Sequence, residues 1–345
     1  MKVGLVSPYD LGRPGGVQDQ VIRLAGWLSD AGHEPRVVGP GVDGPDGSIL
    51  LGSTTVIPAN RAQTPIRLDP RVGRELTVAL SDVDVIHVHE PLMPAVSPAA
   101  LRIEGPAKVA TFHADPPRWV RRLYRHGRTG VRLAVRNAAV VTAVSPIAGS
   151  SIDGVVEYRI VPNGIDVSRY ETGPKMPGKV AFLGRDDERK GLPVLLEAWP
   201  FVREAVPDAT LSVLGASRND SIEGVEFFGW VGDETKEAEL GSASVFCAPN
   251  LGGESFGIIV AEAMASGCAI VASTIPAFEH VAGSTASFVT PGDADELARQ
   301  IIELLLDPDM AARLGAAAEE RVRRFDGSSV AAEYIAAYED AIAHR

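Results

Sequence analysis

Residues 2–28 read KVGLVSPYDLGRPGGVQDQVIRLAGWL and combine three kinds of segment. An apolar run at 2–7 is followed by a loop rich in glycine and proline. An amphipathic segment then places apolar residues at i, i+3, i+4 and i+7, counted from Val21. A run without polar alternation predicts a strand buried on both faces, and the spacing after it predicts a helix.

The same order recurs along the chain. Further strands are predicted at 36–38, 54–57, 83–88, 108–112 and 139–144, and then at 180–183, 210–214, 225–228, 245–248 and 269–272, with helices at 192–205 and about 256–266. Strands that alternate with helices predict parallel sheets and an α/β fold of two Rossmann-like domains. We expect an N-terminal domain at 1–168, a linker at 169–179, a C-terminal domain at 180–326, and a final helix at 327–345 that packs back toward the first domain.

The composition is that of an ordinary globular protein, with 45% apolar and 23% charged residues. A net charge of −12, from 33 basic and 45 acidic residues, argues against a general nucleic-acid binder. Cys247 and Cys268 lie in apolar runs without metal-ligand spacing, which predicts buried thiols in a reducing compartment. The start of the sequence lacks a signal-peptide pattern, and the uncharged stretch 263–278 is too short to span a bilayer. We therefore expect a cytoplasmic protein.

Gly15 and Gly16 stand just before the first predicted helix. Two glycines let backbone N–H groups approach a ligand, and the helix N-terminus attracts an anion. The pattern is not the G-x-G-x-x-G dinucleotide motif. A phosphate contact and a plain tight turn both fit these residues.

The segment 182–191, FLGRDDERKG, places Arg185 and Lys190 directly after a predicted strand. Ligands of open α/β sheets bind beyond the carboxyl ends of strands, so the two cations could bind a diphosphate. The alternative is a solvated loop in which Asp186, Asp187 and Glu188 neutralise the cations.

The segment 252–267, GGESFGIIVAEAMASG, carries Glu254 and Glu262 eight residues apart. If Glu254 begins the helix, the two carboxylates lie about 12 Å apart along its axis. Carboxylates that share one glycosidic bond lie roughly 5–9.5 Å apart, so the spacing suits two ends of a long ligand. Glu254 would bind sugar hydroxyls and Glu262 ribose hydroxyls. The charge between them would be bound by the N–H groups of Ser255, Phe256, Gly257 and Ile258. Two unrelated helix glutamates are the alternative.

Histidines end two predicted strands, with His87, His89 and Glu90 after one and His113 after the other. Because no further ligand cluster accompanies the H-x-H pair, we expect polar contacts rather than a metal site. A loop at 229–236, GWVGDETK, offers Asp233 and Lys236 to the edge of a base.

Taken together, these motifs resemble glycosyltransferase family 4, retaining enzymes of GT-B fold in which two Rossmann-like domains face a central cleft. The likeness covers nearly the whole chain and is closest to the actinobacterial GDP-mannose-dependent phosphatidylinositol mannosyltransferases. It is carried by SPYDLGRPGGVQ, HVHEP, ATFH, VPNGID, FLGR…KG and CAPNLGGESFGIIVAEAMASG. The loop from Arg185 to Lys190 is one residue shorter than in the family, and 61–74 is only mildly basic.

The resemblance implies transfer of a hexose, mannose from GDP-mannose, to phosphatidylinositol or a related lipid, without a metal or other cofactor. Gly16 would touch the diphosphate, Arg185 and Lys190 would clamp it, and His113 would lie beside the reacting centre. Glu254 and Phe256 would hold the sugar, Glu262 the ribose, and Asp233 with Lys236 the base, while Gln18 would belong to the acceptor side. Three alternatives remain: a transferase with another nucleotide sugar and a soluble acceptor, an epimerase or phosphorylase of the same fold, and a nucleotide-binding regulator.

The stretch 118–136, RWVRRLYRHGRTGVRLAVR, is strongly basic in an acidic protein. Drawn as one helix, it gathers seven arginines within about 120° of arc: Arg118, Arg121, Arg122, Arg125, Arg128, Arg132 and Arg136. Large apolar residues occupy the remaining side, which is typical of a helix on an anionic membrane surface. The alternative is a helix broken at Gly127 and Gly130, with its apolar side against the sheet and its arginines solvated.

Overall fold

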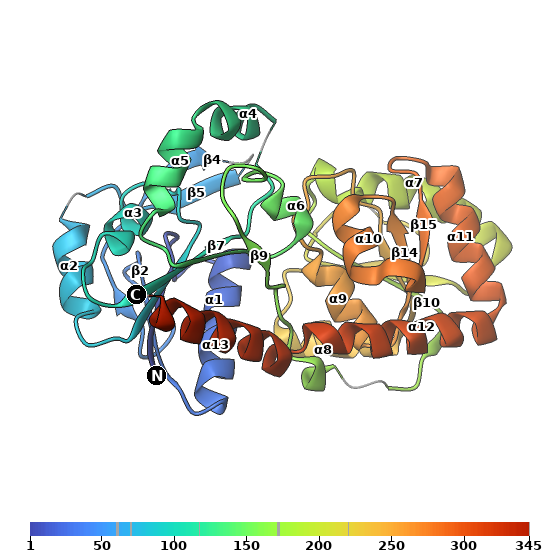
Figure 1. The fold of residues 1–345 in the computed structure, drawn as a ribbon. Helices are drawn as coiled ribbons and strands as arrows, with labels where there is room; N and C mark the ends of the chain where they lie inside the picture. The colour runs from blue at the N-terminus through green and yellow to red at the C-terminus, as the bar shows by residue number, and fades with distance from the viewer. Residues whose placement is uncertain (60–61, 70, 117, 171–172, 220, 345) are drawn as a thin grey trace. The chain divides into compact units, whose positions relative to one another are not determined.

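A computed structural model describes residues 1–59, 62–69, 71–116, 118–170, 173–219 and 221–344 (Figure 1). The chain divides into two compact units. Unit 1 comprises residues 1–164 and 327–345, and unit 2 comprises residues 165–326. This division lies four residues before the boundary expected at 168. The expected linker, 169–179, overlaps the first strand of unit 2, and its residues 171 and 172 lie outside the described part of the chain.

Unit 1 is built on a seven-stranded sheet in the order β3-β2-β1-β6-β7-β8-β9, parallel throughout. Its strands are β1 (Lys2–Val6), β2 (Glu34–Gly39), β3 (Ile49–Leu50), β6 (Val85–His89), β7 (Ala107–Phe112), β8 (Val140–Ala143) and β9 (Arg159–Ile160). Its helices are α1 (Gly16–Asp30), α2 (Val72–Ala79), α3 (Val96–Leu101), α4 (Arg118–His126), α5 (Arg128–Val135), α6 (Pro146–Gly149) and α13 (Gly327–Ala343).

Unit 2 is built on a six-stranded sheet in the order β12-β11-β10-β13-β14-β15, again parallel. Its strands are β10 (Met176–Leu183), β11 (Thr210–Leu214), β12 (Val225–Gly229), β13 (Ala243–Ala248), β14 (Ala269–Ser273) and β15 (Ala286–Val289). Its helices are α7 (Leu192–Ala205), α8 (Asp233–Ser242), α9 (Ile258–Ala265), α10 (Pro276–Ala282), α11 (Ala294–Leu306) and α12 (Pro308–Val322), with 3₁₀ turns η1 (Val167–Arg169), η2 (Glu188–Lys190), η3 (Gly283–Thr285) and η4 (Arg323–Phe325).

The two central strands of unit 1 show why these sheets are parallel. Val3 and Leu5 of β1 face the core formed with α1 and α13, whereas Val6 faces the core formed with α2 and α3. All five residues of β6 are buried. A sheet covered on both faces needs apolar side chains in both directions. The burial of β1 and β6 on both faces therefore confirms the buried parallel strands that the unalternating apolar runs predicted. The two cysteines are buried as predicted, and burial raises the pKa of both thiols.

One predicted strand has a different role from the one expected. The strand predicted at 54–57 is β4 (Thr55–Ala59), which pairs antiparallel with β5 (Ala62–Ile66) in a separate hairpin. Two residues separate β4 from β5, whereas parallel pairing needs a crossover of a dozen or more. The strands β3, β9 and β15 were not predicted. Each is short and lies at the edge of its sheet, where few apolar residues are needed.

A tryptophan of α1 lies against the two positions where the chain passes between the units. A Cβ on Gly164 would lie 2.5 Å from the ring of Trp27, and a Cβ on Gly327 would lie 2.2 Å from it. Both glycines therefore let the backbone approach the indole closely. From Gly327 the chain continues into α13 (Figure 1), which packs against α1 and β7. Tyr334 and Tyr338 of this helix are buried.

Candidate functional site

The switch in strand order of unit 2 lies at β10, which has β11 on one side and β13 on the other. The loops that follow β10 and β13 meet at this edge of the sheet, where the N–H of Leu251 donates to the carbonyl of Arg189 at 2.8 Å. Gly191 has a φ of +71°, and a Cβ there would lie 1.9 Å from the carbonyl oxygen of Pro249. Only glycine fits this close approach, and the carboxyl ends of strands at a switch in strand order are where open α/β sheets bind ligands.

Lys190 and Glu254 come together at this edge of the sheet. The Lys190 ammonium lies 2.8 Å from Oε2 of Glu254, and each side chain is about one-fifth exposed. The side-chain amide of Asn250 approaches the same oxygen at 3.4 Å. The site thus joins a cation and a carboxylate that are 64 residues apart in the sequence.

The acidic residues beside Arg185 and Lys190 have other partners. Asp187 accepts from the guanidinium of Arg189 at 2.8 Å, and Asp186 accepts from that of Arg218 at 2.8 Å. Hydrogen bonding from Arg189 lowers the pKa of Asp187. The exposed Arg185 also contributes to that shift by its charge. Arg189 was missed in the sequence, although it stands between the two cations that were singled out.

The helix α9 begins later than predicted, and this changes two assignments. Gly257 precedes it with a φ of +99°, a left-handed conformation that a helix interior excludes. Glu254 therefore lies in the loop before the helix. The expected separation of about 12 Å from Glu262 assumed that Glu254 begins the helix, and that assumption was wrong. The side chain of Phe256 is buried against Phe325, so only its backbone could face a ligand.

Glu262 has a cation of its own. This carboxylate, on α9 and 5% exposed, lies 3.0 Å from the ammonium of Lys236. Lys236 also lies 3.1 Å from Asp233, whose second oxygen contacts Arg169 at 3.0 Å. Partial burial opposes the ionisation of Asp233, but Lys236 and Arg169 outweigh it and lower the pKa. Arg169 was missed because the sequence placed it in a linker.

The corresponding switch in unit 1 lies between β1 and β6. A Cβ on Gly16, the first residue of α1, would meet no atom within 4 Å, so internal packing does not require this glycine. A Cβ on Gly15 would lie 2.5 Å from the side chain of Gln18, which is buried and donates to the carbonyl of Asp10 at 3.2 Å. Gln18 thus braces the glycine loop from inside the unit.

A chain of buried histidines lies at the end of β6. Nδ1 of His89 lies 2.8 Å from Nε2 of His113, and the rings of His87 and His89 are 4.1 Å apart. His87 contacts the hydroxyls of Tyr338 at 2.8 Å and Thr111 at 2.6 Å. Burial lowers the pKa of all three imidazoles, that of His113 to about 4. The three rings are therefore neutral at physiological pH.

Glu90 orients the backbone beneath His113. One carboxylate oxygen accepts from the N–H groups of His113 at 2.7 Å and Ala114 at 2.6 Å. Glu90 itself has a φ of +49°, an uncommon conformation outside glycine. Among the described residues, no group of three or more His, Cys, Asp or Glu side chains is arranged to hold a metal ion.

Comparison with known proteins adds a family to this geometry. A model of glycosyltransferase family 4 matches residues 14–169, and a model of glycosyl transferases group 1 matches residues 177–307. The chain is 37% identical to a phosphatidyl-myo-inositol mannosyltransferase of Mycolicibacterium smegmatis, over 98% of this chain and 94% of that protein. It is 35% identical to the protein of the same name in Mycobacterium leprae, over 98% and 96%.

The chain belongs to glycosyltransferase family 4. Its fold is similar to that of a glycosyltransferase from Rickettsia africae, with a TM-score of 0.78, 17% identity, and coverage of 99% of this chain and 98% of that one. The predicted fold class, two Rossmann-like domains of the GT-B type, is confirmed.

The basic stretch of this glycosyltransferase does not form the single helix that was predicted. The alternative, a break at Gly127, is confirmed, whereas Gly130 lies within a helix. The stretch forms α4 and α5, and Gly127 leaves the helical conformation between them. Arg121 bonds to Asp115, and Val131 is buried in the core while Tyr124 packs against it. Arg122 and Arg125 are exposed, as are Trp119 and Leu123, at 68% and 59%. The side chain of Arg118 lies outside the described residues.

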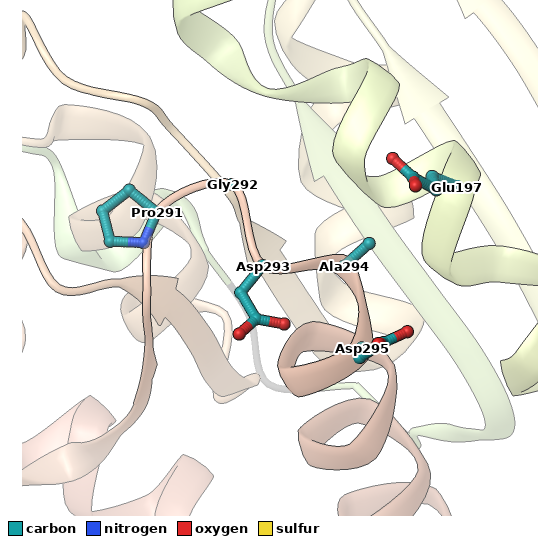
Figure 2. A pocket seen from close by; sticks show the side chains of 6 residues that line it. All are labelled: Glu197, Pro291, Gly292, Asp293, Ala294 and Asp295. Carbon is teal, nitrogen blue, oxygen red and sulfur yellow. The ribbon is translucent and has the colours of Figure 1, made fainter.

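An acidic hollow in unit 2 of the glycosyltransferase does not suit a diphosphate. Figure 2 shows its lining, in which Glu197, Asp293 and Asp295 supply three carboxylates. Asp293 also caps α11 by accepting from the N–H of Glu296 at 2.8 Å. Carboxylates repel an anionic ligand, so the loops at Lys190 are the better candidate for the donor site.

The buried histidines predict how stability depends on pH. A pKa of about 4 for folded His113 lies below the ordinary value of 6.5, so the unfolded chain binds the proton more tightly. Its contribution to stability is present above pH 6.5 and is lost as pH falls toward 4. Between these values the free energy of unfolding should decrease by up to about 1.4 kcal/mol per pH unit from this residue.

Urea titrations of the wild type and of His113→Gln at several pH values measure this contribution. The stability difference between the two proteins should shrink as pH falls from 6.5 to 4, because glutamine does not titrate. A difference that stays constant over this range would contradict a neutral, buried His113.

Proposed function

We propose that this glycosyltransferase moves a mannosyl residue from GDP-mannose to phosphatidylinositol at a membrane surface. The observation that carries the proposal is the 37% identity, over 98% of the chain, to a protein named phosphatidyl-myo-inositol mannosyltransferase. Such identity along both units supports a shared donor and a shared acceptor. Unit 2 would bind the nucleotide sugar, and unit 1 would bind the acceptor.

In the proposed donor site, Arg185 and Lys190 bind the diphosphate. Lys190 stands at the strand-order switch, where its ammonium now faces Glu254. A diphosphate would replace Glu254 as its partner and leave that carboxylate for hydroxyls of the sugar. The N–H groups of Phe256, Gly257 and Ile258, at the start of α9, would add hydrogen bonds to the leaving group.

The base end of the donor would lie at Asp233 and Lys236. Guanine offers N–H donors at N1 and N2, which suit a carboxylate, and an acceptor at O6, which suits an ammonium. Glu262 would accept from the ribose hydroxyls while Lys236 neutralises it. The pairing of each glutamate with its own lysine supports an extended donor with a sugar end and a base end.

Charge governs the proposed reaction. Breaking the anomeric bond builds positive charge on the sugar and negative charge on the diphosphate, so fixed cations and helix N–H groups stabilise the transition state. Because His113 is neutral, it would form a hydrogen bond with the transferred sugar without repelling the positive charge that develops on it. The incoming hydroxyl would attack the anomeric carbon on the face that the diphosphate leaves and pass its proton to the departing diphosphate oxygen, which retains the anomeric configuration.

The helix α4 is proposed to contact the membrane that holds the acceptor. Trp119 and Leu123 are one helical turn apart and exposed, next to the exposed Arg122 and Arg125. Exposed apolar side chains flanked by cations are typical of helices that lie in the headgroup region. Within the part of the chain that the structure describes, no helix is both long and apolar enough to cross a bilayer.

A transfer assay tests the proposed function directly. The protein, incubated with radiolabelled GDP-mannose and vesicles that contain phosphatidylinositol, should produce a labelled lipid. UDP-glucose, or vesicles without phosphatidylinositol, should give little product. Label that appears only in water-soluble products would exclude a lipid acceptor.

The two glutamates should separate sugar binding from nucleotide binding. Glu254→Gln should reduce turnover without weakening GDP binding, because Glu254 lies at the sugar end and competes with the diphosphate for Lys190. Glu262→Gln should weaken GDP itself, by about 1.5–3 kcal/mol for a lost charge-assisted bond. Calorimetry with GDP distinguishes them, and equal losses in both variants would contradict a donor with two ends.

Vesicle binding tests the role of α4. Each arginine near an anionic leaflet contributes about 1 kcal/mol, so Arg122→Glu/Arg125→Glu should reduce co-sedimentation with anionic vesicles at low salt. The matched control is Arg299→Glu/Arg313→Glu, which changes the charge equally on exposed positions of unit 2. Equal binding of both double variants, or a wild type that ignores anionic vesicles, would contradict membrane contact through α4.

A further inference from the structure

The two passages of the chain across the border of unit 2 are bonded to each other. Ile165 begins the unit, and its N–H donates to the carbonyl of Phe325 at 2.9 Å. Ile165 also forms a parallel bridge with Asp326, the last residue of the unit. The carboxylate of Asp326 accepts from the N–H of Val167 at 3.3 Å. These bonds hold the start of η1 in place.

The 3₁₀ turn η1 then brings Arg169 to the first turn of α8. Nη2 of Arg169 lies 3.0 Å from Oδ2 of Asp233 and 2.8 Å from Oε1 of Glu237. These two acidic residues are four positions apart and so lie on the same face of α8. One guanidinium thus holds two carboxylates of α8 from a segment that lies five residues after the border of unit 1.

The contacts continue from Asp233 toward the proposed ribose site. One oxygen of Asp233 faces Arg169, and the other lies 3.1 Å from Lys236. Lys236 lies 3.0 Å from Glu262 and 5.9 Å from the ring centre of Tyr170. Cations and carboxylates therefore alternate in one run from Arg169 to Glu262, and each charge limits the directions its neighbour can take.

The exposure of Arg169 and Asp233 argues against a mainly stabilising role for their ion pair. The side chain of Arg169 is 41% exposed and that of Asp233 is 52% exposed. Ion pairs so open to water add little to stability. A half-exposed carboxylate can also accept bonds from a ligand while it keeps the arginine. Without Arg169, Asp233 could turn both oxygens toward Lys236, and the pair would no longer present a separate acceptor and donor.

We propose that Arg169 is a positioning residue for recognition of the nucleotide base. It holds Asp233 so that the carboxylate accepts from the N–H groups of guanine while Lys236 donates to O6. This inference rests on the proposed function, which assigns Asp233 and Lys236 to the base. It assigns to the border segment of unit 2 a part in choosing among nucleotides.

Affinities for three nucleoside diphosphates test the inference. GDP, IDP and UDP are titrated by calorimetry into the wild type, Arg169→Ala, Arg169→Lys and Asp233→Asn. IDP lacks the N2 amino group, so the ratio of GDP to IDP affinity reports the bond to Asp233. A charge-assisted bond is equivalent to roughly tenfold or more in affinity. Arg169→Ala should reduce the ratio about fivefold or more, in the same direction as Asp233→Asn, and Arg169→Lys should restore part of it.

The matched control is Arg159→Ala in unit 1. Arg159 pairs with Asp340 at 2.8 Å, and the two side chains are 41% and 53% exposed, which is nearly the environment of Arg169 and Asp233. This variant should keep the wild-type ratio, and the melting temperature of Arg169→Ala should match that of the control.

The outcomes distinguish failure of the positioning role of Arg169 from failure of the proposed base site at Asp233 and Lys236. If Asp233→Asn lowers the ratio and Arg169→Ala does not, the positioning role is wrong while the base site stands. If neither variant changes the ratio, the assignment of the base site itself fails, and the inference fails with it. If Arg169→Ala weakens all three nucleotides equally and lowers the melting temperature, the arginine is structural, and the inference is overturned.

Discussion

The parallel pairing of β10 with β13 is the constraint on which the candidate donor site depends. Parallel strands end at the same edge, so the loops after β10 and β13 must meet there, although 64 residues separate Lys190 from Glu254. The approach is so close that Gly191 has no room for a Cβ beside Pro249. A change in the order of these two strands would separate Lys190 from Glu254, whatever their chemistry.

The charges of that site are compensated before any ligand arrives. Lys190 pairs with Glu254, and Lys236 pairs with Glu262. None of the four side chains is more than about one-fifth exposed. An unpaired charge at such depth would be costly, so each lysine stabilises the carboxylate that it faces. A donor then exchanges one partner for another. In the proposed function, a diphosphate would replace Glu254 at Lys190, and the released carboxylate would become available to sugar hydroxyls.

Unit 1 uses burial in the opposite way, to keep three histidines uncharged. Three histidine rings lie in contact, and desolvation lowers the pKa of each. Because His87 bonds to Tyr338 of α13, the final helix of the chain supports the same cluster that contains His113. In the proposed reaction, a neutral His113 would hydrogen-bond to the sugar without adding positive charge where positive charge develops.

Much of this protein follows from the sequence by itself. Unalternating apolar runs indicated parallel sheets, because a strand covered on both faces must be apolar in both directions. The motifs after those runs indicated the family and singled out Lys190, Glu254 and Glu262. Only the tertiary structure decided which charge meets which. Arg169 reaches Asp233 across 64 residues, and no local period encodes such a contact. The tertiary structure also decided that the side chain of Phe256 is buried and that 118–136 forms two helices. The left-handed Gly257 and the non-helical Gly127 depend on backbone conformation and packing rather than on residue spacing.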